Sequence, residues 1–245
     1  MAQSILPLAP ESPVALYVDG SRLAILFCSP FDLDELAVGY ALARGLVTHP
    51  GDLKALAVRP DQRSVSLTTL SGSGAGHADE GWIFSACGAA SLREAQAVSD
   101  KPVLEWAREA RDFSLEDLNA LSRRMFGAAE LYRKTGGMHI AALAAKPASA
   151  KEYFVAREDV GRHNAVDKVL GRGFLDRIEF RRAVLITSGR IAADMVLKAG
   201  AAGIPLIASR SIPTTEAYRL ALDRRIVLVG RIGSAQPLVY SGGSP

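Results

Sequence analysis

The segment Tyr153–Leu170, YFVAREDVGRHNAVDKVL, joins a predicted strand to a predicted helix through a charged turn. Its first four residues are apolar, as at the end of a buried strand, and Val160, Ala165 and Val169 then follow at helical spacings. Side chains at the end of such a strand, and free N–H groups at the helix start, point into one crevice in α/β folds. The segment therefore predicts either a ligand site or a solvated turn held by local ion pairs. The charged and polar side chains of the turn are Arg157, Glu158, Asp159, Arg162 and His163.

The same segment resembles the signature of a known family. Arg157–Lys168, R-E-D-V-G-R-H-N-A-V-D-K, is similar to a block of the FdhD family, the formate dehydrogenase accessory sulfurtransferases. Thr135–His139 (TGGMH) and Gly200–Pro205 (GAAGIP) resemble other blocks of that family, in the same order. The resemblance extends from about Val14 to Tyr240, which is nearly the whole chain.

The composition is that of an ordinary globular protein. The chain has 245 residues, of which 49% are hydrophobic and 22% charged, and its formal net charge is +3. This length suits one large domain or two small ones with an ample core. The mild positive charge is far from the clustered excess of a nucleic-acid-binding protein, so no nucleic-acid partner is expected. It would suit a small phosphate-bearing ligand without requiring one.

We expect a cytoplasmic protein that does not enter a membrane. The first residues, MAQSILPLAPESP, lack the positive region and continuous apolar run of a signal peptide. No window approaches 18 uninterrupted apolar residues. Two cysteines, Cys28 and Cys87, are too few for a disulfide framework or a four-cysteine zinc site. Free thiols fit a reducing compartment.

The first part of the chain reads as β-rich. Two hairpins are predicted, over Val14–Cys28 and Leu53–Leu70, with a helix from about Asp32 to Leu46 between them. A long helix is predicted over Ser114–Lys134, with Asp117 as the capping partner of its first residue.

From Met138 the pattern alternates between strands and helices. This order predicts a three-layer α/β arrangement whose sheet is largely parallel near its end. The change of pattern divides the chain into a β-rich part, residues 1–112, which contains Cys87, and an α/β part, residues 113–245. The FdhD resemblance implies a cytidine-deaminase-like fold for the second part. Strands are predicted at His139–Ala144, Tyr153–Ala156, Ala183–Thr187, Leu206–Ala208 and Ile226–Val229, and helices at Val160–Leu170, Ile191–Ala201 and Thr214–Leu222.

Cys87 is the leading candidate for catalysis. It lies in the small-residue stretch Ala86–Ala90, ACGAA, which suits an accessible loop. A thiolate there could accept a sulfane sulfur as a persulfide and release it again, with His163 or an arginine favouring the anion. The alternative is a small buried hydrophobic residue. Cys28 ends an apolar strand and is expected in the core; it could resolve a persulfide only if the fold brings it close to Cys87.

The FdhD resemblance favours the catalytic interpretation of Cys87. The family motif resembles C-G-x-C-G, and Cys87 and Gly88 match its first two positions. Ala90 and Ser91 stand where the second cysteine and glycine would be. This departure removes any mechanism that needs a second thiol in the motif, but a carrier with one thiol stays possible because a single sulfur can accept and donate.

The segment Thr187–Arg190, TSGR, follows a predicted strand and precedes a predicted helix. A hydroxyl, a glycine and an arginine at a helix start suit phosphate binding, and an ordinary helix cap is the alternative. The resemblance implies that this segment, similar to T-S-R-A, contributes to a pocket for the guanine-nucleotide ends of the bis-molybdopterin guanine dinucleotide cofactor. Ser188 matches that pattern; Gly189 departs from it, and Arg190 lies one place later.

A loop after the last predicted strand completes the candidate site. Alone it reads as an exposed tail, but its place between Gly230 and Tyr240 corresponds to a family segment that contacts the cofactor. The resemblance thus implies cofactor binding by this loop, Ser188 and Arg190, in a pocket shaped by the charged turn. The expected binding residues are Arg157, Asp159, Arg162, His163, Ser188, Arg190, Arg231, Ile232, Gly233, Ser234, Ala235 and Gln236. His139 is either structural or faces the cysteine loop.

The resemblance and the residues together give one main hypothesis. A cysteine desulfurase loads a persulfide onto Cys87, the sulfur passes to the molybdenum (or tungsten) of the cofactor, and formate dehydrogenase receives it. The resemblance also implies a homodimer. The deaminase zinc motif H-x-E with P-C-x-x-C is absent, so no metal of the protein's own is expected. The alternatives are a cofactor-binding chaperone without sulfur transfer, and a nucleotide-acting enzyme on the same fold.

Overall fold

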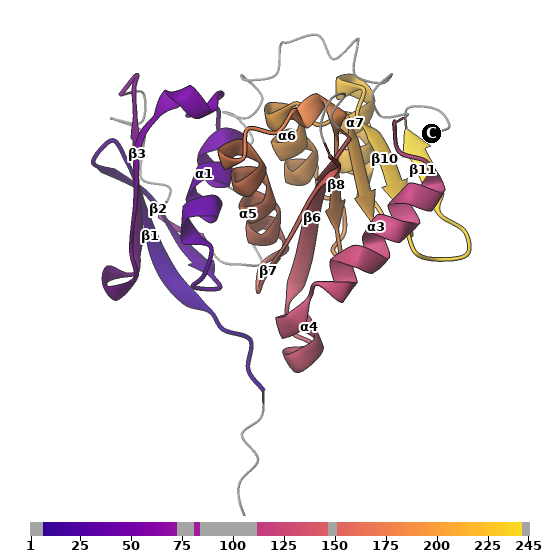
Figure 1. The fold of residues 1–245 in the computed structure, drawn as a ribbon, viewed down its shortest axis with the longest axis horizontal. Coiled ribbons are helices and arrows are strands. Elements are labelled where there is room, and N and C mark those ends of the chain that lie inside the picture. The colour runs from indigo at the N-terminus through magenta and orange to yellow at the C-terminus, as the bar shows by residue number, and fades with distance from the viewer. Residues whose placement is uncertain (1–6, 73–80, 84–111, 147–150, 242–245) are drawn as a thin grey trace, which may run out of the picture.

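The computed structural model describes residues 7–72, 81–83, 112–146 and 151–241, which form two β-sheets with helices packed between and outside them (Figure 1). The strand order is β3-β4-β1-β2-β5 in the first sheet and β11-β10-β9-β8-β6-β7 in the second. The first sheet contains β1 (Ser12–Val18), β2 (Ser21–Cys28), β3 (Leu53–Arg59), β4 (Ser64–Thr69) and β5 (Trp82–Ile83). The second contains β6 (His139–Ala145), β7 (Tyr153–Asp159), β8 (Ala183–Thr187), β9 (Leu206–Ser209), β10 (Val227–Gly230) and β11 (Leu238–Ser241).

Six α-helices occur in the described residues: α1 (Leu33–Ala43), α3 (Leu115–Gly127), α4 (Glu130–Thr135), α5 (Arg162–Leu175), α6 (Ala193–Ala202) and α7 (Thr215–Arg224). Short 3₁₀ turns lie at Pro50–Asp52, Pro60–Gln62 and Phe180–Arg182. None of the helices described is long and apolar enough to cross a membrane.

Both predicted hairpins of the first sheet are confirmed. β1 pairs with β2 and β3 pairs with β4, each in antiparallel fashion. The first turn is tight because Asp19 and Gly20 both adopt positive φ angles, 49° and 85°, which match the twist of the flanking strands. The helix predicted after this hairpin is confirmed as α1, and it covers the inner face of the sheet.

The two sheets share one apolar core because α1 and α5 approach each other closely. A Cβ atom on Gly39 of α1 would collide with the main chain of Asp167, and one on Gly171 of α5 would collide with the main chain of Glu35. Only glycine permits this backbone contact. The cluster of buried side chains continues from Leu16 of β1 through the two helices to the second sheet.

The second sheet separates two layers of helices, as the alternation of its side chains requires. Leu143 and Leu185 face α5 and α6, whereas Ile140 and Ile186 face Met125 of α3 on the other side. The predicted α/β class is therefore confirmed. The likeness to cytidine deaminase and the division at residue 112 stay predictions.

The prediction that the sheet is largely parallel near its end is confirmed over β8, β9 and β10, whereas its other neighbouring strands are antiparallel. Two predicted helices in this second part need correction. β7 continues to Asp159, so α5 begins at Arg162 instead of Val160 and ends at Leu175. The helix predicted over 114–134 is two helices.

The break between α3 and α4 has a long-range cause. Ala129 is extended, and the carboxylate of Glu158 accepts hydrogen bonds from the main-chain N–H groups of Leu131 and Tyr132, at 3.0 and 2.6 Å. These bonds satisfy free donors at the start of α4. The predicted capping pair of Ser114 and Asp117 is confirmed at the start of α3.

Candidate functional site

Most of the predicted binding residues gather along one edge of the second sheet. Strand β6 begins there and β7, β8, β9 and β10 end there, since His139 pairs with Asp159 and Thr187 with Ser209. Helices α5, α6 and α7 follow from this edge (Figure 1). The topology thus brings together the turn after β7, the segment Thr187–Arg190 and the loop after β10. Such an edge is where open α/β sheets bind ligands.

Asp159 belongs to a fully buried network of an ion pair and hydrogen bonds near this edge. Its carboxylate lies 2.8 Å from Nζ of Lys168, and both side chains are 0% exposed. It also accepts hydrogen bonds from the main-chain N–H groups of Ser29 and Gly161 and from the side chain of Asn164. A direct contact between Asp159 and a ligand would require these bonds to open.

Arg157 points to α1 instead of to the edge. Its guanidinium donates two hydrogen bonds to the carboxylate of Glu35, at 2.6 and 2.7 Å, and lies 3.5 Å from Asp32. Burial raises the pKa of Glu35, and the bonds from Arg157 oppose that rise. This bidentate pair fixes β7 to α1.

His163 lies against a carboxylate that the sequence analysis missed. Its Nε2 is 2.9 Å from Oδ2 of Asp194 on α6, and the two side chains are only 7% and 17% exposed. Burial raises the pKa of Asp194, but the contact with His163 and the charges of Lys198 and Arg162 outweigh it, so the pKa falls below its ordinary value. An acidic residue in the first turn of a helix is commonplace, so no local signal could have found Asp194.

A second buried pair lies beside this contact. Lys198 of α6 donates to the carboxylate of Asp167 on α5. Burial raises the pKa of Asp167, and the charge of Lys198 opposes the rise. Lys198 thus pairs with Asp167, and the ion-pair partner of Asp194 is His163.

Arg162 and His139 meet over Gly189. A Cβ atom on Gly189 would lie 3.0 Å from Cδ of Arg162 and 3.6 Å from Nδ1 of His139. Burial lowers the pKa of His139, as do the nearby charges of Arg162 and His163. Nε of Arg162 is buried and has no hydrogen-bond partner among the described residues.

Ser188 and Arg190 play different parts at this edge. The main chain of Ser188 donates to the carbonyl of Ile140, and its hydroxyl accepts from the N–H of Ile140, at 2.9 and 3.0 Å. Ser188 therefore continues the pairing of β8 with β6. Arg190 is exposed and forms no ion pair within the described part of the chain, so its guanidinium is available to an anion.

The loop Arg231–Gln236 is built on the end of β9. Main-chain N–H groups of Arg231 and Ile232 donate to the carbonyls of Ser211 and Ser209, at 2.9 and 3.0 Å. The hydroxyl of Ser209, also missed by the sequence analysis, donates to the carbonyl of Gly189 and so links this loop to the β8 turn. The side chain of Ile232 is buried in the core, whereas the other residues of the loop are exposed.

The structure describes one of the two cysteines. Cys87 lies outside the described residues. Cys28 is fully buried and unbonded, and burial, followed by the charge of Asp159, raises the pKa of its thiol to about 12. The prediction that Cys28 belongs to the core is confirmed.

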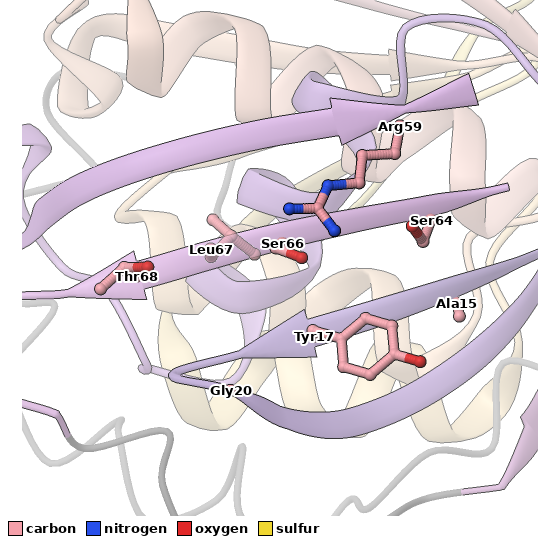
Figure 2. A pocket seen from close by; sticks show the side chains of 8 residues that line it. All are labelled: Ala15, Tyr17, Gly20, Arg59, Ser64, Ser66, Leu67 and Thr68. Atoms are coloured by element: carbon pink, nitrogen blue, oxygen red, sulfur yellow. The ribbon is translucent and has the colours of Figure 1, made fainter. Parts of the chain in front are cut away.

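A separate hollow of about 430 Å³ lies on the outer face of the first sheet. Figure 2 shows Tyr17 and Arg59 beside the small side chains of Ser64, Ser66 and Thr68 there. None of the predicted site residues lines it. Within the described chain, no group of three or more His, Cys, Asp or Glu side chains is arranged to hold a metal ion. The edge of the second sheet, with its buried polar cluster and exposed arginines, is the stronger candidate site.

Comparison with known proteins agrees with this architecture. The FdhD/NarQ family model matches residues 9–244. The chain is 33% identical over 233 residues to the sulfur carrier protein FdhD of Staphylococcus aureus MRSA252, covering 94% of this chain and 86% of that protein. The sulfur carrier protein FdhD of Staphylococcus haemolyticus is 32% identical with the same coverage.

A solved structure from Desulfotalea psychrophila, named for a proposed role as a formate dehydrogenase accessory protein, shares the fold. It matches with a TM-score of 0.75 and 24% identity, over 96% of this chain and 88% of that one. With a family model that spans almost every residue, and relatives above 30% identity, the chain belongs to the FdhD/NarQ family.

Proposed function

We propose that this protein is a sulfur carrier that accepts a persulfide sulfur on Cys87 and delivers it to the molybdenum cofactor used by formate dehydrogenase. The observation that carries the proposal is the match of the whole chain to a family whose similar members are named sulfur carrier proteins. The accessory role named for the Desulfotalea psychrophila protein fits formate dehydrogenase as the recipient.

The structure supports the choice of thiol by elimination. The chain has two cysteines, and one of them, Cys28, is sealed in the core with a pKa of about 12. A thiol with that pKa is almost entirely protonated at neutral pH, and the thiolate is the form that attacks sulfur. Cys87 is therefore the residue that we assign to sulfur transfer.

The loading step is a thiol exchange. The Cys87 thiolate attacks the outer sulfur of a cysteine desulfurase persulfide, a new sulfur–sulfur bond forms on Cys87, and the desulfurase cysteine leaves as a thiolate. No electrons enter or leave the pair of proteins. One cysteine on this chain suffices for that exchange, so the alanine at position 90 does not prevent it.

The cofactor to be sulfurated is the substrate of the next step. We propose that its guanine-nucleotide ends bind at the edge of the second sheet, where Arg190 and Arg231 are exposed and suit phosphate groups. Arg162 and the exposed loop residues Gly233–Gln236 complete this surface. The proposal also places the protein in the cytoplasm as a homodimer.

Intact-protein mass spectrometry after incubation with a cysteine desulfurase and cysteine tests the proposal. We expect wild type and Cys28→Ala to gain one reducible sulfur atom, and Cys87→Ala to gain none. Sulfur on Cys87→Ala would overturn the assignment. Failure of every variant, while a known acceptor is loaded in parallel, would favour a cofactor-binding chaperone, which the missing second motif cysteine keeps as the second candidate.

A further inference from the structure

The hollow on the outer face of the first sheet follows from the alternation of side chains along its strands. In β1, Leu16 is buried in the core and Tyr17 is half-buried; in β4, Val65 is buried and Ser66 is half-buried. Tyr17 pairs with Ser66 in parallel register. Because successive side chains of a strand point to opposite faces, Tyr17 and Ser66 stand together on the face turned away from α1.

Small residues give this face its depth. Ala15 of β1 pairs with Ser64 of β4, and Ser64 pairs in turn with Arg59 of β3. Alanine and serine rise little above the sheet, so they leave space between the ring of Tyr17 and the guanidinium of Arg59, which Figure 2 shows on the same side of the strands. The volume of about 430 Å³ lies within the range of about 300–1,000 Å³ that is usual for small-molecule sites. The hollow can therefore hold a whole small molecule.

The polar side chains around the hollow are not used by the fold. Arg59 is exposed, and its guanidinium forms no ion pair or hydrogen bond within the described chain. Four hydroxyl groups beside it also lack a partner among the residues that the structure describes: those of Tyr17, Ser64, Ser66 and Thr68. Ser64 is only 7% exposed, so its hydroxyl has little access to water outside the hollow. Five polar groups from three strands are thus free to bind a ligand.

The charge of the hollow is positive. Among the described residues that line it, Arg59 is charged and none is an aspartate or glutamate. The carboxylate of Asp19, next to Gly20 of the lining, accepts hydrogen bonds from the N–H and the hydroxyl of Thr69, at 2.6 and 2.7 Å. A guanidinium can bind a phosphate or carboxylate through two parallel hydrogen bonds, and hydroxyl groups can both donate to and accept from other hydroxyls.

We propose that this hollow is a second ligand site, which takes a small molecule that combines an oxyanion, either phosphate or carboxylate, with a hydroxyl-bearing body. Arg59 pairs with the oxyanion, and the ring of Tyr17 covers one side of the body. The hydroxyls of Ser64, Ser66 and Thr68 bind the hydroxyl groups of the body. The site shares no residue with the edge of the second sheet, so the proposal goes beyond sulfur transfer and does not depend on it.

Backbone amide NMR of the whole protein locates the binding. The probes are ribose 5-phosphate, gluconate and uncharged ribose. We expect the amide signals of Tyr17 and Ser66 to shift saturably with at least one of the two charged probes, with a dissociation constant of about 1 mM or tighter, and to stay unchanged with ribose. A response to ribose 5-phosphate alone identifies a phosphate site, and a response to gluconate alone identifies a carboxylate site. The signals of residues 187–190 report separately on binding at the edge of the second sheet.

Three variants test the recognition. Arg59→Gln should weaken binding roughly 10- to 100-fold, because it removes hydrogen bonds from a charged donor. Ser66→Phe keeps the charge but fills the hollow, so it should abolish the shifts. Lys54→Gln is the matched control: it removes an exposed positive charge from the same strand, outside the lining of the hollow, and should bind within about twofold of wild type.

Several results would overturn the proposal. Neither charged probe might shift the signals of Tyr17 and Ser66, or ribose might shift them equally well. Binding at wild-type strength in Arg59→Gln or in Ser66→Phe would show that the probe is held elsewhere. The amide spectrum of each variant also shows whether it is folded. Persulfide loading of Cys87 is measured independently, so a failure at this hollow leaves the proposed function untouched.

Discussion

The two halves of the charged turn between β7 and α5 look alike in sequence but differ in how their polar atoms are satisfied. Arg157 and Asp159, in the first half, are bonded to Glu35 of α1, to Ser29 just after β2, and to the start of α5 and Lys168. Arg162 and His163, in the second half, each keep a buried nitrogen without a partner among the described residues. The first half is tied into the surrounding structure, and the second half contains buried polar atoms without a partner in the described part of the chain.

The difference shows why a dense run of charges predicts a site poorly by itself. Structural ion pairs and functional groups use the same residue types. The distinguishing feature is an unpaired polar atom where water is excluded, and only the three-dimensional structure shows it.

The largest expected effect follows from breaking the first half. Asp159→Asn leaves the ammonium group of Lys168 fully buried without its carboxylate. Removing one partner of such a pair costs about 3–5 kcal/mol. Urea unfolding at neutral pH measures the loss of unfolding free energy.

A double variant controls for the pair itself. Asp159→Asn with Lys168→Met removes both charges and should recover part of the lost stability, because no buried charge is left unpaired. A loss below about 1 kcal/mol in the single variant, typical of exposed pairs, would contradict the fully buried network.

A smaller loss is expected from separating the helices that carry the two halves. Gly39→Ala places a methyl group against the main chain of Asp167 and should destabilise the protein by about 1–3 kcal/mol. Gly127→Ala is the matched control, since a Cβ atom there has nothing within 4 Å. We expect it to be neutral or stabilising by about 0.5 kcal/mol, measured by thermal unfolding. Equal effects at the two sites would argue against the close helix contact.

The smallest effect concerns the pH dependence of stability. The pKa of His139 is lowered from 6.5, first by burial and then by the charges of Arg162 and His163. On acidification His139 therefore becomes protonated in the unfolded chain at a pH where it is still neutral in the folded chain. The unfolding free energy should therefore fall as pH drops below about 6.5. The His139→Gln variant should lack the part of this loss of unfolding free energy that is due to His139. Denaturant titrations at pH 7.5 and 5.5 measure the loss in wild type and in the variant. Parallel losses in both would show that His139 is not held neutral by its surroundings.

Much of the fold could be predicted from the sequence because its signals are local. The Asp19-Gly20 turn, the capping pair of Ser114 and Asp117, and the alternation of strands and helices all act within a few residues. The break between α3 and α4 depends on Glu158, far along the chain, and no local pattern announces it.

The site was less predictable because its properties depend on contacts between residues that lie far apart in the sequence. Charged residues at the β7–α5 turn were identified, but their division into a structural and an unsatisfied half depends on partners such as Glu35 and Asp194, which lie on other elements. The core position of Cys28 followed correctly from its apolar strand. The role of Cys87 stays a prediction.

The most direct test of the division between the two halves is to measure stability and persulfide loading in His163→Gln and Asp159→Asn side by side. We predict that His163→Gln keeps its unfolding free energy within about 1 kcal/mol of wild type, because the glutamine amide can still donate to the carboxylate of Asp194, while its loading rate at neutral pH falls sharply. Asp159→Asn should lose stability and, at a temperature where it is folded, load sulfur at close to the wild-type rate. The reverse pattern, with His163→Gln unstable and active and Asp159→Asn stable and inactive, would contradict the account.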